Sequence, residues 1–334
     1  MPHRVSIKGT HPFSQNSLSQ SCIIISLRGH SGGRKIKVAM YQSRFAFLLL
    51  ISFLLVPLSL FSREIPPIVS SEWLEQNRDN PKVIIVDIRD SENYRKGHIP
   101  GAVNTPYSLW AVVNNGLLLE LPSDEALRDL LGKSGIKSDS AVVVVNKFDS
   151  DFSRADATRV AWTCIVAGVK NAAVLDGGYE RWMSGNKPVT TNQINPEMGE
   201  YSEPINRSLV ALKSYVLGNI GKSVLVDNRT PEDYFGITSG PGHIKSAVNL
   251  PTPWAFTSDG RFRNKEDLER MANGVVGEDK SKEIIVYCGV GGYASTWWFL
   301  LTQLLGYHNV KLYDGSIQEW LEDPSAPVTA YRWK

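Results

Sequence analysis

Short apolar runs rich in β-branched residues alternate with longer segments of helical period through the C-terminal four-fifths of the chain. The strand-like runs are continuously apolar rather than alternating, which indicates burial on both faces and a parallel sheet covered by helices on each side. We therefore predict an α/β fold. The clearest strands are SVLVDNR (223–229), AVNLP (247–251), EIIVYC (283–288) and VKLYDG (310–315), and the clearest helices are 264–275 and 294–306.

This pattern occurs twice, at a spacing near 140 residues. The segment VIIVDIRDSENYRKGHIPGAVNTP, from Val83, is repeated as SVLVDNRTPEDYFGITSGPGHIKSAVNLP, from Ser223, and NAAVLDGGYERW is repeated as NVKLYDGSIQEW. Internal repetition on this scale indicates duplicated structural units. Polar, proline-containing residues 190–206 have the composition of a linker. We predict two copies of one domain, 66–189 and 207–334.

Residues 1–62 differ from the rest in charge, because they hold seven Lys or Arg and no Asp or Glu. The remaining chain has 29 basic and 34 acidic residues, a net charge of about −5. A body with this balance and no basic run lacks the electrostatic footprint of a nucleic-acid-binding protein. We expect no nucleic-acid partner.

The leader contains the apolar stretch FAFLLLISFLLVPLSLF, residues 45–61, between Arg44 and Ser62. A basic flank followed by an apolar core and small residues is typical of an export signal, here cleaved near Ser62. Its length is at the short limit for spanning a bilayer, so an uncleaved membrane anchor is the alternative. We expect an exported protein of the periplasm or cell envelope, and translation starts at either Met1 or Met40.

The chain has three cysteines, Cys22, Cys164 and Cys288. An exported protein with an even pair suggests a disulfide, but Cys164 lies in an apolar helical pattern and Cys288 in a glycine-rich bend. We therefore predict that these two thiols are free. No cluster has metal-ligand spacing, and no phosphate or dinucleotide motif occurs, so we expect neither metal nor bound cofactor.

The bend after Cys288 predicts an anion site. The strand ends at Tyr287, a helix begins near Ala294, and Gly289, Gly291 and Gly292 permit the positive φ that lets successive amides point at one spot. Together with the helix N-terminus, this nest is expected to lower the thiol pKa and favour the thiolate. An inert buried cysteine, the alternative, needs no such glycines.

The ordered motifs VDNR, GHI, AVN, VYCGVGGYAS, YDGS and EW, set on a duplicated domain, resemble the tandem-domain rhodanese family of sulfurtransferases over residues 66–334. The resemblance implies that Cys288 is the catalytic cysteine. It would take a sulfane sulfur from a small anionic donor, thiosulfate or 3-mercaptopyruvate, carry it as a covalent persulfide, and pass it to a thiol or cyanide. The cradling loop would be Gly289, Val290, Gly291, Gly292 and Tyr293.

The first copy lacks this equipment. Its matching strand runs into Asn146 and a charged segment, 147–157, that contains no glycine. We expect this copy to be inactive, and the resemblance implies that it serves as a scaffold for the active copy, with the site near their interface.

Four further residues have predicted roles in or near the site. Arg229 either binds the substrate or ties down a strand end, because Arg89 occupies the same place in the inactive copy. Asp227 and His243 also recur in both copies, so we assign them structural roles near the site. Asp314 follows the last strand and is predicted to cap the next helix.

Two departures from the family pattern leave the donor open. The sequence Gly289-Val290-Gly291 offers neither the basic residues of thiosulfate-preferring members nor the hydroxyl of mercaptopyruvate-preferring ones, and Asp233 stands where many relatives have a second arginine. A phosphatase, which needs an arginine six residues after the cysteine, is disfavoured by Ala294. The alternative function is a non-catalytic or protein-fed sulfur-relay module of the cell envelope.

Overall fold

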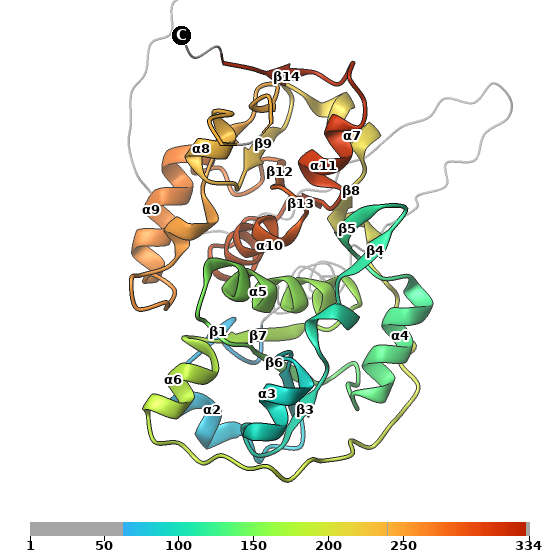
Figure 1. The fold of residues 1–334 in the computed structure, drawn as a ribbon, viewed down its shortest axis with the longest axis vertical. Coiled ribbons are helices and arrows are strands. Elements are labelled where there is room, and N and C mark those ends of the chain that lie inside the picture. Colours follow the sequence, from blue (N-terminus) through green and yellow to red (C-terminus); the bar gives the residue numbers. More distant parts are fainter. Residues whose placement is uncertain (1–62, 239, 332–334) are drawn as a thin grey trace, which may run out of the picture. The chain divides into compact units, whose positions relative to one another are not determined.

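A computed structural model describes residues 63–238 and 240–331. Two five-stranded parallel sheets dominate it, one in each predicted copy, and helices lie on both faces of each sheet (Figure 1). The expected α/β fold is therefore confirmed. The predictions for residues 1–62, including the export signal, lie outside the described residues.

The first copy forms a sheet of order β1-β7-β6-β2-β3 with all neighbours parallel. Its strands are β1 (Ile68–Val69), β2 (Val83–Asp87), β3 (Ala102–Asn104), β6 (Ala141–Val145) and β7 (Asn171–Leu175), with a separate antiparallel hairpin of β4 (Val112–Asn114) and β5 (Leu117–Glu120). Its helices are α2 (Ser71–Asn77), α3 (Ser91–Lys96), α4 (Asp124–Lys133), α5 (Asp151–Val166) and α6 (Gly178–Ser184), and a 3-10 turn, η1, spans Tyr107–Leu109.

The second copy forms a sheet of order β11-β9-β12-β13-β8, again all parallel. Its strands are β8 (Val210–Ala211), β9 (Val224–Asp227), β11 (Val248–Asn249), β12 (Ile284–Tyr287) and β13 (Val310–Tyr313), with an antiparallel pair of β10 (His243–Ile244) and β14 (Val328–Thr329). Its helices are α7 (Lys213–Asn219), α8 (Pro231–Tyr234), α9 (Lys265–Val276), α10 (Gly292–Phe299) and α11 (Ser316–Leu321), with 3-10 turns η2 (Arg207–Leu209) and η3 (Thr252–Ala255) and a π-helical turn, η4 (Leu300–Leu304), after α10.

The two sheets have the same strand order when equivalent strands are compared. Strand β12 lies beside β9 in the register Tyr287↔Asp227, and β6 lies beside β2 in the register Val145↔Asp87. Cys288 therefore leaves the carboxyl edge of the second sheet level with the end of β9. Ligands of open parallel sheets bind at this edge.

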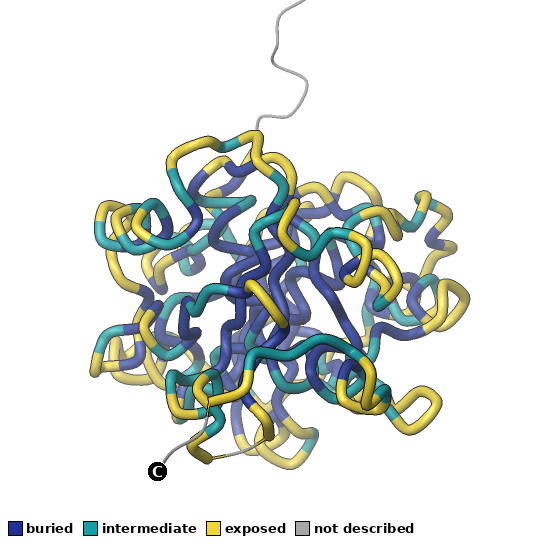
Figure 2. Tube along the Cα trace, turned by 90° about the horizontal axis from the view of Figure 1, so that it is seen from above, coloured by how far each residue is buried: buried dark blue, intermediate teal, exposed yellow. Residues whose placement is uncertain are grey.

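Helices α5 and α10 pack against each other between the two sheets, so the copies share one hydrophobic core (Figure 1). Thr158 of α5 bonds the Thr296 hydroxyl at 2.9 Å, and Trp162 packs edge-on against Trp298 at 6.4 Å between ring centroids. Figure 2 shows these strands and central helices as the buried interior and the exposed residues on surrounding loops. Thr296 and Trp298 thus contact the other copy.

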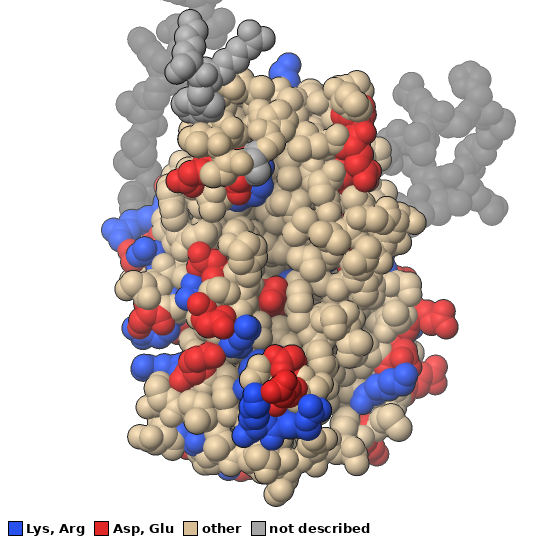
Figure 3. Space-filling view, in the orientation of Figure 1, with Lys and Arg blue, Asp and Glu red and all other residues tan. Residues whose placement is uncertain are grey.

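The linker is held against the first copy rather than merely connecting the two. Tyr201 is buried, and its hydroxyl donates to the Ala167 carbonyl at 2.9 Å. No helix among residues 63–238 and 240–331 is long and apolar enough to cross a membrane. On the face drawn in Figure 3, basic and acidic side chains are interspersed.

Candidate active site at the interface of the two copies

Cys288 lies between β12 and α10, and two carbonyls of its loop are bound by α11. The carbonyls of Cys288 and Gly289 accept hydrogen bonds of 3.1 Å from the first free amides of α11, those of Ile317 and Gln318. The Cys288 amide donates to the Ser316 hydroxyl at 3.2 Å. The start of α11 thus fixes which way each peptide of the loop faces.

Three backbone amides of the loop and of the start of α10 favour negative charge on the sulfur. The N–H groups of Val290, Gly291 and Ala294 each lower the pKa of Cys288. Burial outweighs them, because Cys288 is 2% exposed, and the net pKa of the thiol is raised. The predicted lowering of the thiol pKa is wrong for this closed site, since desolvation disfavours the thiolate more than the amides favour it.

Of the loop glycines, Gly291 is the one whose conformation and surroundings both demand glycine. Its φ is +83°, and a Cβ there would lie 2.8 Å from the Asp314 Oδ1 and 2.9 Å from the Asp314 carbonyl. A Cβ on Gly289 would meet nothing within 4 Å. The loop is therefore tightest where it touches Asp314.

Asp314 does not cap α11, contrary to the sequence prediction. The N-cap position is Gly315, and no side chain caps this helix. The carboxylate of Asp314 instead accepts from the Arg159 Nη1 at 2.5 Å and from the Leu121 amide at 2.8 Å, both in the first copy. An ion pair across the interface satisfies this buried carboxylate better than a solvent-facing cap position would.

Arg229 is tied to Asp227 by its Nε and Nη2, and its Nη2 also donates to the Gly242 carbonyl at 2.8 Å. Arg89 makes the same bonds to Asp87 and Gly97 in the copy without a cysteine. This geometry favours the structural alternative for Arg229, and its role in binding substrate stays a prediction.

His243 also follows its counterpart. Its ring stacks on Tyr234 at 3.8 Å, and its Nδ1 lies 3.0 Å from the Tyr234 carbonyl oxygen. His98 is placed in the same way on Tyr94. The geometry agrees with structural roles for both histidines, and burial lowers the pKa of His243, which keeps its ring neutral.

Tyr293 ends the loop at the boundary between the copies. Its ring stacks on Phe152 of α5 at 5.0 Å, and its carbonyl accepts from the Thr252 hydroxyl at 2.7 Å. Burial raises its pKa to about 12, so the phenol stays protonated. The ring is therefore a neutral group contacted by the other copy.

The first copy has no thiol at the equivalent place. Asn146 follows β6, its side chain donates to the Ser153 carbonyl, and its carbonyl accepts from the Tyr179 amide. Cys164 is fully buried in α5, is not in a disulfide, and has a pKa raised by burial. Within the described ranges, no group of His, Cys, Asp and Glu is arranged to hold a metal ion.

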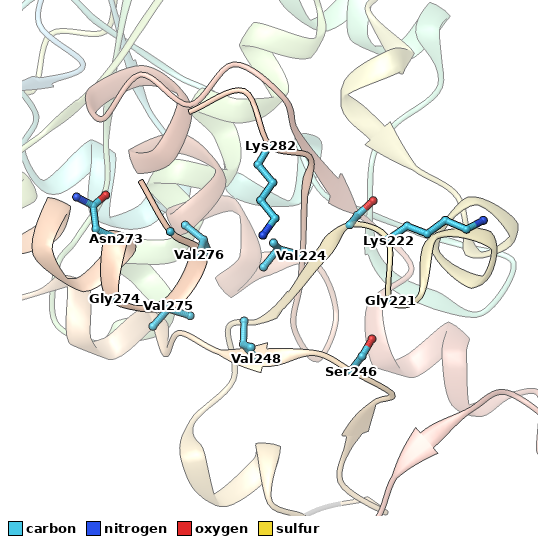
Figure 4. A pocket seen from close by; sticks show the side chains of 12 residues that line it. Gly221, Lys222, Val224, Ser246, Val248, Asn273, Gly274, Val275, Val276 and Lys282 are labelled. Carbon is cyan, nitrogen blue, oxygen red and sulfur yellow. The ribbon is translucent and has the colours of Figure 1, made fainter. Parts of the chain in front are cut away.

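A cavity of about 510 Å³ lies elsewhere in the second copy, beside the starts of β9 and β11 (Figure 4). Val224 and Val248 line it, with Lys222 and Lys282 on its walls. These strands begin there and end at the Cys288 edge, so the cavity lies at the opposite end of the sheet from the thiol. We assign it no part in the chemistry.

Sequence reasoning missed three residues that shape the loop, Arg159, Ser316 and Gln318. Arg159 could have been found, because a lone arginine inside the apolar helical run of α5 requires a buried partner. Ser316 has φ +52° and supports the Cys288 amide, and nothing in its sequence context indicates this conformation.

Comparison with known proteins matches the Rhodanese-like domain model to residues 70–184 and 213–323. A "Putative thiosulfate sulfurtransferase" of Mycolicibacterium smegmatis is 31% identical, over 78% of this chain and 96% of the relative. The "Sulfur carrier protein TtuD" of Thermus thermophilus is 33% identical, over 78% and 95%. The structure of YnjE is similar, with a TM-score of 0.70 and 24% sequence identity over 80% of this chain and 69% of YnjE. The structure of an EanB variant in complex with ergothioneine is also similar, with a TM-score of 0.70 and 23% identity over 80% of this chain and 71% of that one.

Proposed function

Since the chain belongs to the rhodanese-like family of sulfurtransferases, with two such domains in tandem, we propose that Cys288 carries a sulfane sulfur as a persulfide. The observation that supports this most is the arrangement of the loop peptides. Carbonyls of residues 288 and 289 are bound by α11, while the amides of residues 290, 291 and 294 favour negative charge on the sulfur.

The proposed transfer has two steps. The thiolate of Cys288 attacks the outer sulfur of the donor, a new S–S bond forms, and the donor's bond to that sulfur breaks with both electrons leaving on sulfite or on the enolate of pyruvate. Cyanide or an acceptor thiolate then attacks the outer sulfur of the persulfide, and the thiolate of Cys288 leaves. The amides supply electrostatic stabilisation to whichever sulfur is charged.

Charge around the loop favours a donor of low charge. Three buried or half-buried arginines near the loop are already paired, Arg229 with Asp227, Arg159 with Asp314 and Arg154 with Asp151. A monoanion such as 3-mercaptopyruvate is therefore easier to admit than the thiosulfate dianion, because desolvating a second unpaired charge is costly.

The experiment is intact-mass and peptide mass spectrometry after incubation with each donor, followed by thiocyanate release with cyanide. We expect a gain of one sulfur atom on the Cys288 peptide, its loss in Cys288→Ser, and its retention in the matched control Cys164→Ala. A folded protein that gains no sulfur from either donor would overturn the proposal for small donors.

That negative outcome would favour a second candidate, a relay that receives sulfur from a protein-bound persulfide. The nearly complete burial of Cys288 and the paired arginines favour it, as does the similarity to a protein named a sulfur carrier. Its test is sulfur transfer from a persulfidated protein to Cys288 when both small donors fail.

We also propose that this chemistry takes place outside the cytoplasm, on the basis of the basic and apolar leader before Ser62. The mass of the N-terminus of protein purified from the envelope fraction tests this. A chain that begins at Met1 or Met40 and stays in the cytoplasm would contradict it.

A further inference from the structure

Arg159 is a fully buried charge on α5, in the copy that has no catalytic cysteine. Its Nη1 donates to the Asp314 carboxylate and lies 3.4 Å from the Gly291 carbonyl, both in the other copy, and its Nη2 donates to the Leu119 carbonyl at 2.6 Å. A buried guanidinium is tolerated only when paired, and these partners bring it against the Cys288 loop.

Both oxygens of Asp314 are held by the first copy. One accepts from Arg159, and the other accepts from the Leu121 amide. Gly291 packs on this ion pair so closely that an added Cβ would lie 2.8 Å from the carboxylate and 3.1 Å from the Arg159 Nη1. The amide of this same glycine favours negative charge on the sulfur of Cys288.

The hairpin β4–β5 of the first copy completes the contact. Leu118 exchanges two backbone hydrogen bonds, of 3.0 and 2.9 Å, with the side chain of Gln318 on α11. The next residue, Leu119, has φ +57°, a left-handed conformation costly for a side chain with a Cβ. Such a conformation persists where the surroundings over-determine it, so the hairpin is fixed by the interface.

We propose that Arg159 is a positioning residue for the Cys288 loop: through Asp314 and the Gly291 carbonyl, the copy without a nucleophile holds the loop that cradles the sulfur of the other copy. The inference rests on the proposed role of Cys288 and adds that the first copy supplies part of the site's electrostatics. Arg159 acts through the loop and does not touch the sulfur.

Other charged and titratable groups surround the pair and belong in its electrostatic balance. Glu120 of β5 lies near Asp314 and near Glu319 of α11, and Tyr107 of η1 and Asp156 of α5 lie near Arg159. Burial, with the charge of Asp314 beside it, raises the pKa of Glu120 to about 7. Arg159 is thus the cation of a largely acidic group of side chains.

The test measures the pKa of Cys288 from the pH dependence of its alkylation by iodoacetamide in the full chain. Arg159→Gln removes the positive member of the pair and should raise that pKa, slowing alkylation at neutral pH about three- to tenfold. Asp314→Asn removes the negative member, keeps the shape of the side chain and should lower the pKa by a similar factor. Arg159→Lys should restore most of the wild-type value.

The matched control is Thr158→Val on the same helix. It removes the hydrogen bonds to Ser295 and Thr296 across the interface but leaves the Arg159–Asp314 pair and the bond from Ser295 to the Gly292 carbonyl in place, and we expect no change in the alkylation pKa. Equal or same-direction shifts for the Arg159 and Asp314 variants would overturn the proposal, because a purely structural role predicts loss without opposite signs. Where Arg159→Gln does not fold, the sign for Asp314→Asn decides alone. Alkylation requires no sulfur donor, so a failure of the proposed sulfur transfer is detected separately.

Discussion

Replacing Gly291 with alanine tests the conformation on which the site depends. The φ of +83° costs an alanine about 1–2 kcal/mol. Its Cβ would also stand 2.8 Å from the Asp314 carboxylate and 2.9 Å from the Asp314 carbonyl, distances that force a shift. Overpacking of this kind costs about 1–3 kcal/mol. We therefore expect the free energy of unfolding to fall by about 2–5 kcal/mol.

The control is Gly289→Ala in the same loop, where a Cβ meets nothing within 4 Å. Urea unfolding should place this variant within about 0.5 kcal/mol of the wild type. Under conditions where both variants are folded, sulfur uptake measured by intact mass should be lost in Gly291→Ala, since its amide is displaced, and kept in Gly289→Ala. Equal stability and equal uptake in the two variants would refute the reasoning.

Three further predictions concern charge and burial. Arg229→Met and Arg89→Met each leave a buried aspartate unpaired, and each should lower the free energy of unfolding in urea by about 3–5 kcal/mol. If both variants fold and only the Arg229 variant loses activity, Arg229 binds substrate instead. Burial raises the pKa of Cys288 above its ordinary value of 9.0, so the rate of alkylation of this thiol in the native protein should still be increasing with pH at pH 9. Cys164 should react only when the protein unfolds. An alkylation rate that reaches a plateau near pH 7 would contradict the raised pKa of Cys288. Burial and the charge of Asp314 raise the pKa of Glu120 from 4.5 to about 7, so folding stability should decrease as pH rises from about 4.5 to 7. In thermal melts, Glu120→Gln should reduce this decrease in stability. An unchanged pH dependence in the variant would contradict the raised pKa of Glu120.

The sequence predicted the sheets well because their strands are short, apolar and repeated. The run before Cys288 and its equivalent before Asn146 became β12 and β6, in the parallel order that continuous apolar strands indicate. The hairpin β4–β5 was not predicted, because the residues that flank its turn do not alternate between apolar and polar. Asn115-Gly116, a dipeptide typical of two-residue hairpin turns, was a signal that could have found it.

Prediction of the site was less complete, for an electrostatic reason. Of the three glycines in the loop, Gly291 alone has the positive φ that the sequence predicted. Burial cannot be obtained from local sequence, and burial decides the sign of the pKa shift. The role of Asp314 was also missed, since its partner Arg159 lies 155 residues away in the other copy and their contact exists only after the two copies dock.

The ion pair between Arg159 and Asp314 also limits how the two halves of this protein can diverge or be exchanged. The N-terminal half has no thiol at the equivalent place, but helix α5 and the hairpin of that half remain fitted to the residues beside the Cys288 loop of the other half. A chimera that joins the C-terminal half to a foreign N-terminal half would keep Cys288 but leave the buried Asp314 without its counter-charge. An exchange of domains in this architecture therefore has to carry over the interface residues of α5 and the hairpin as well as the fold.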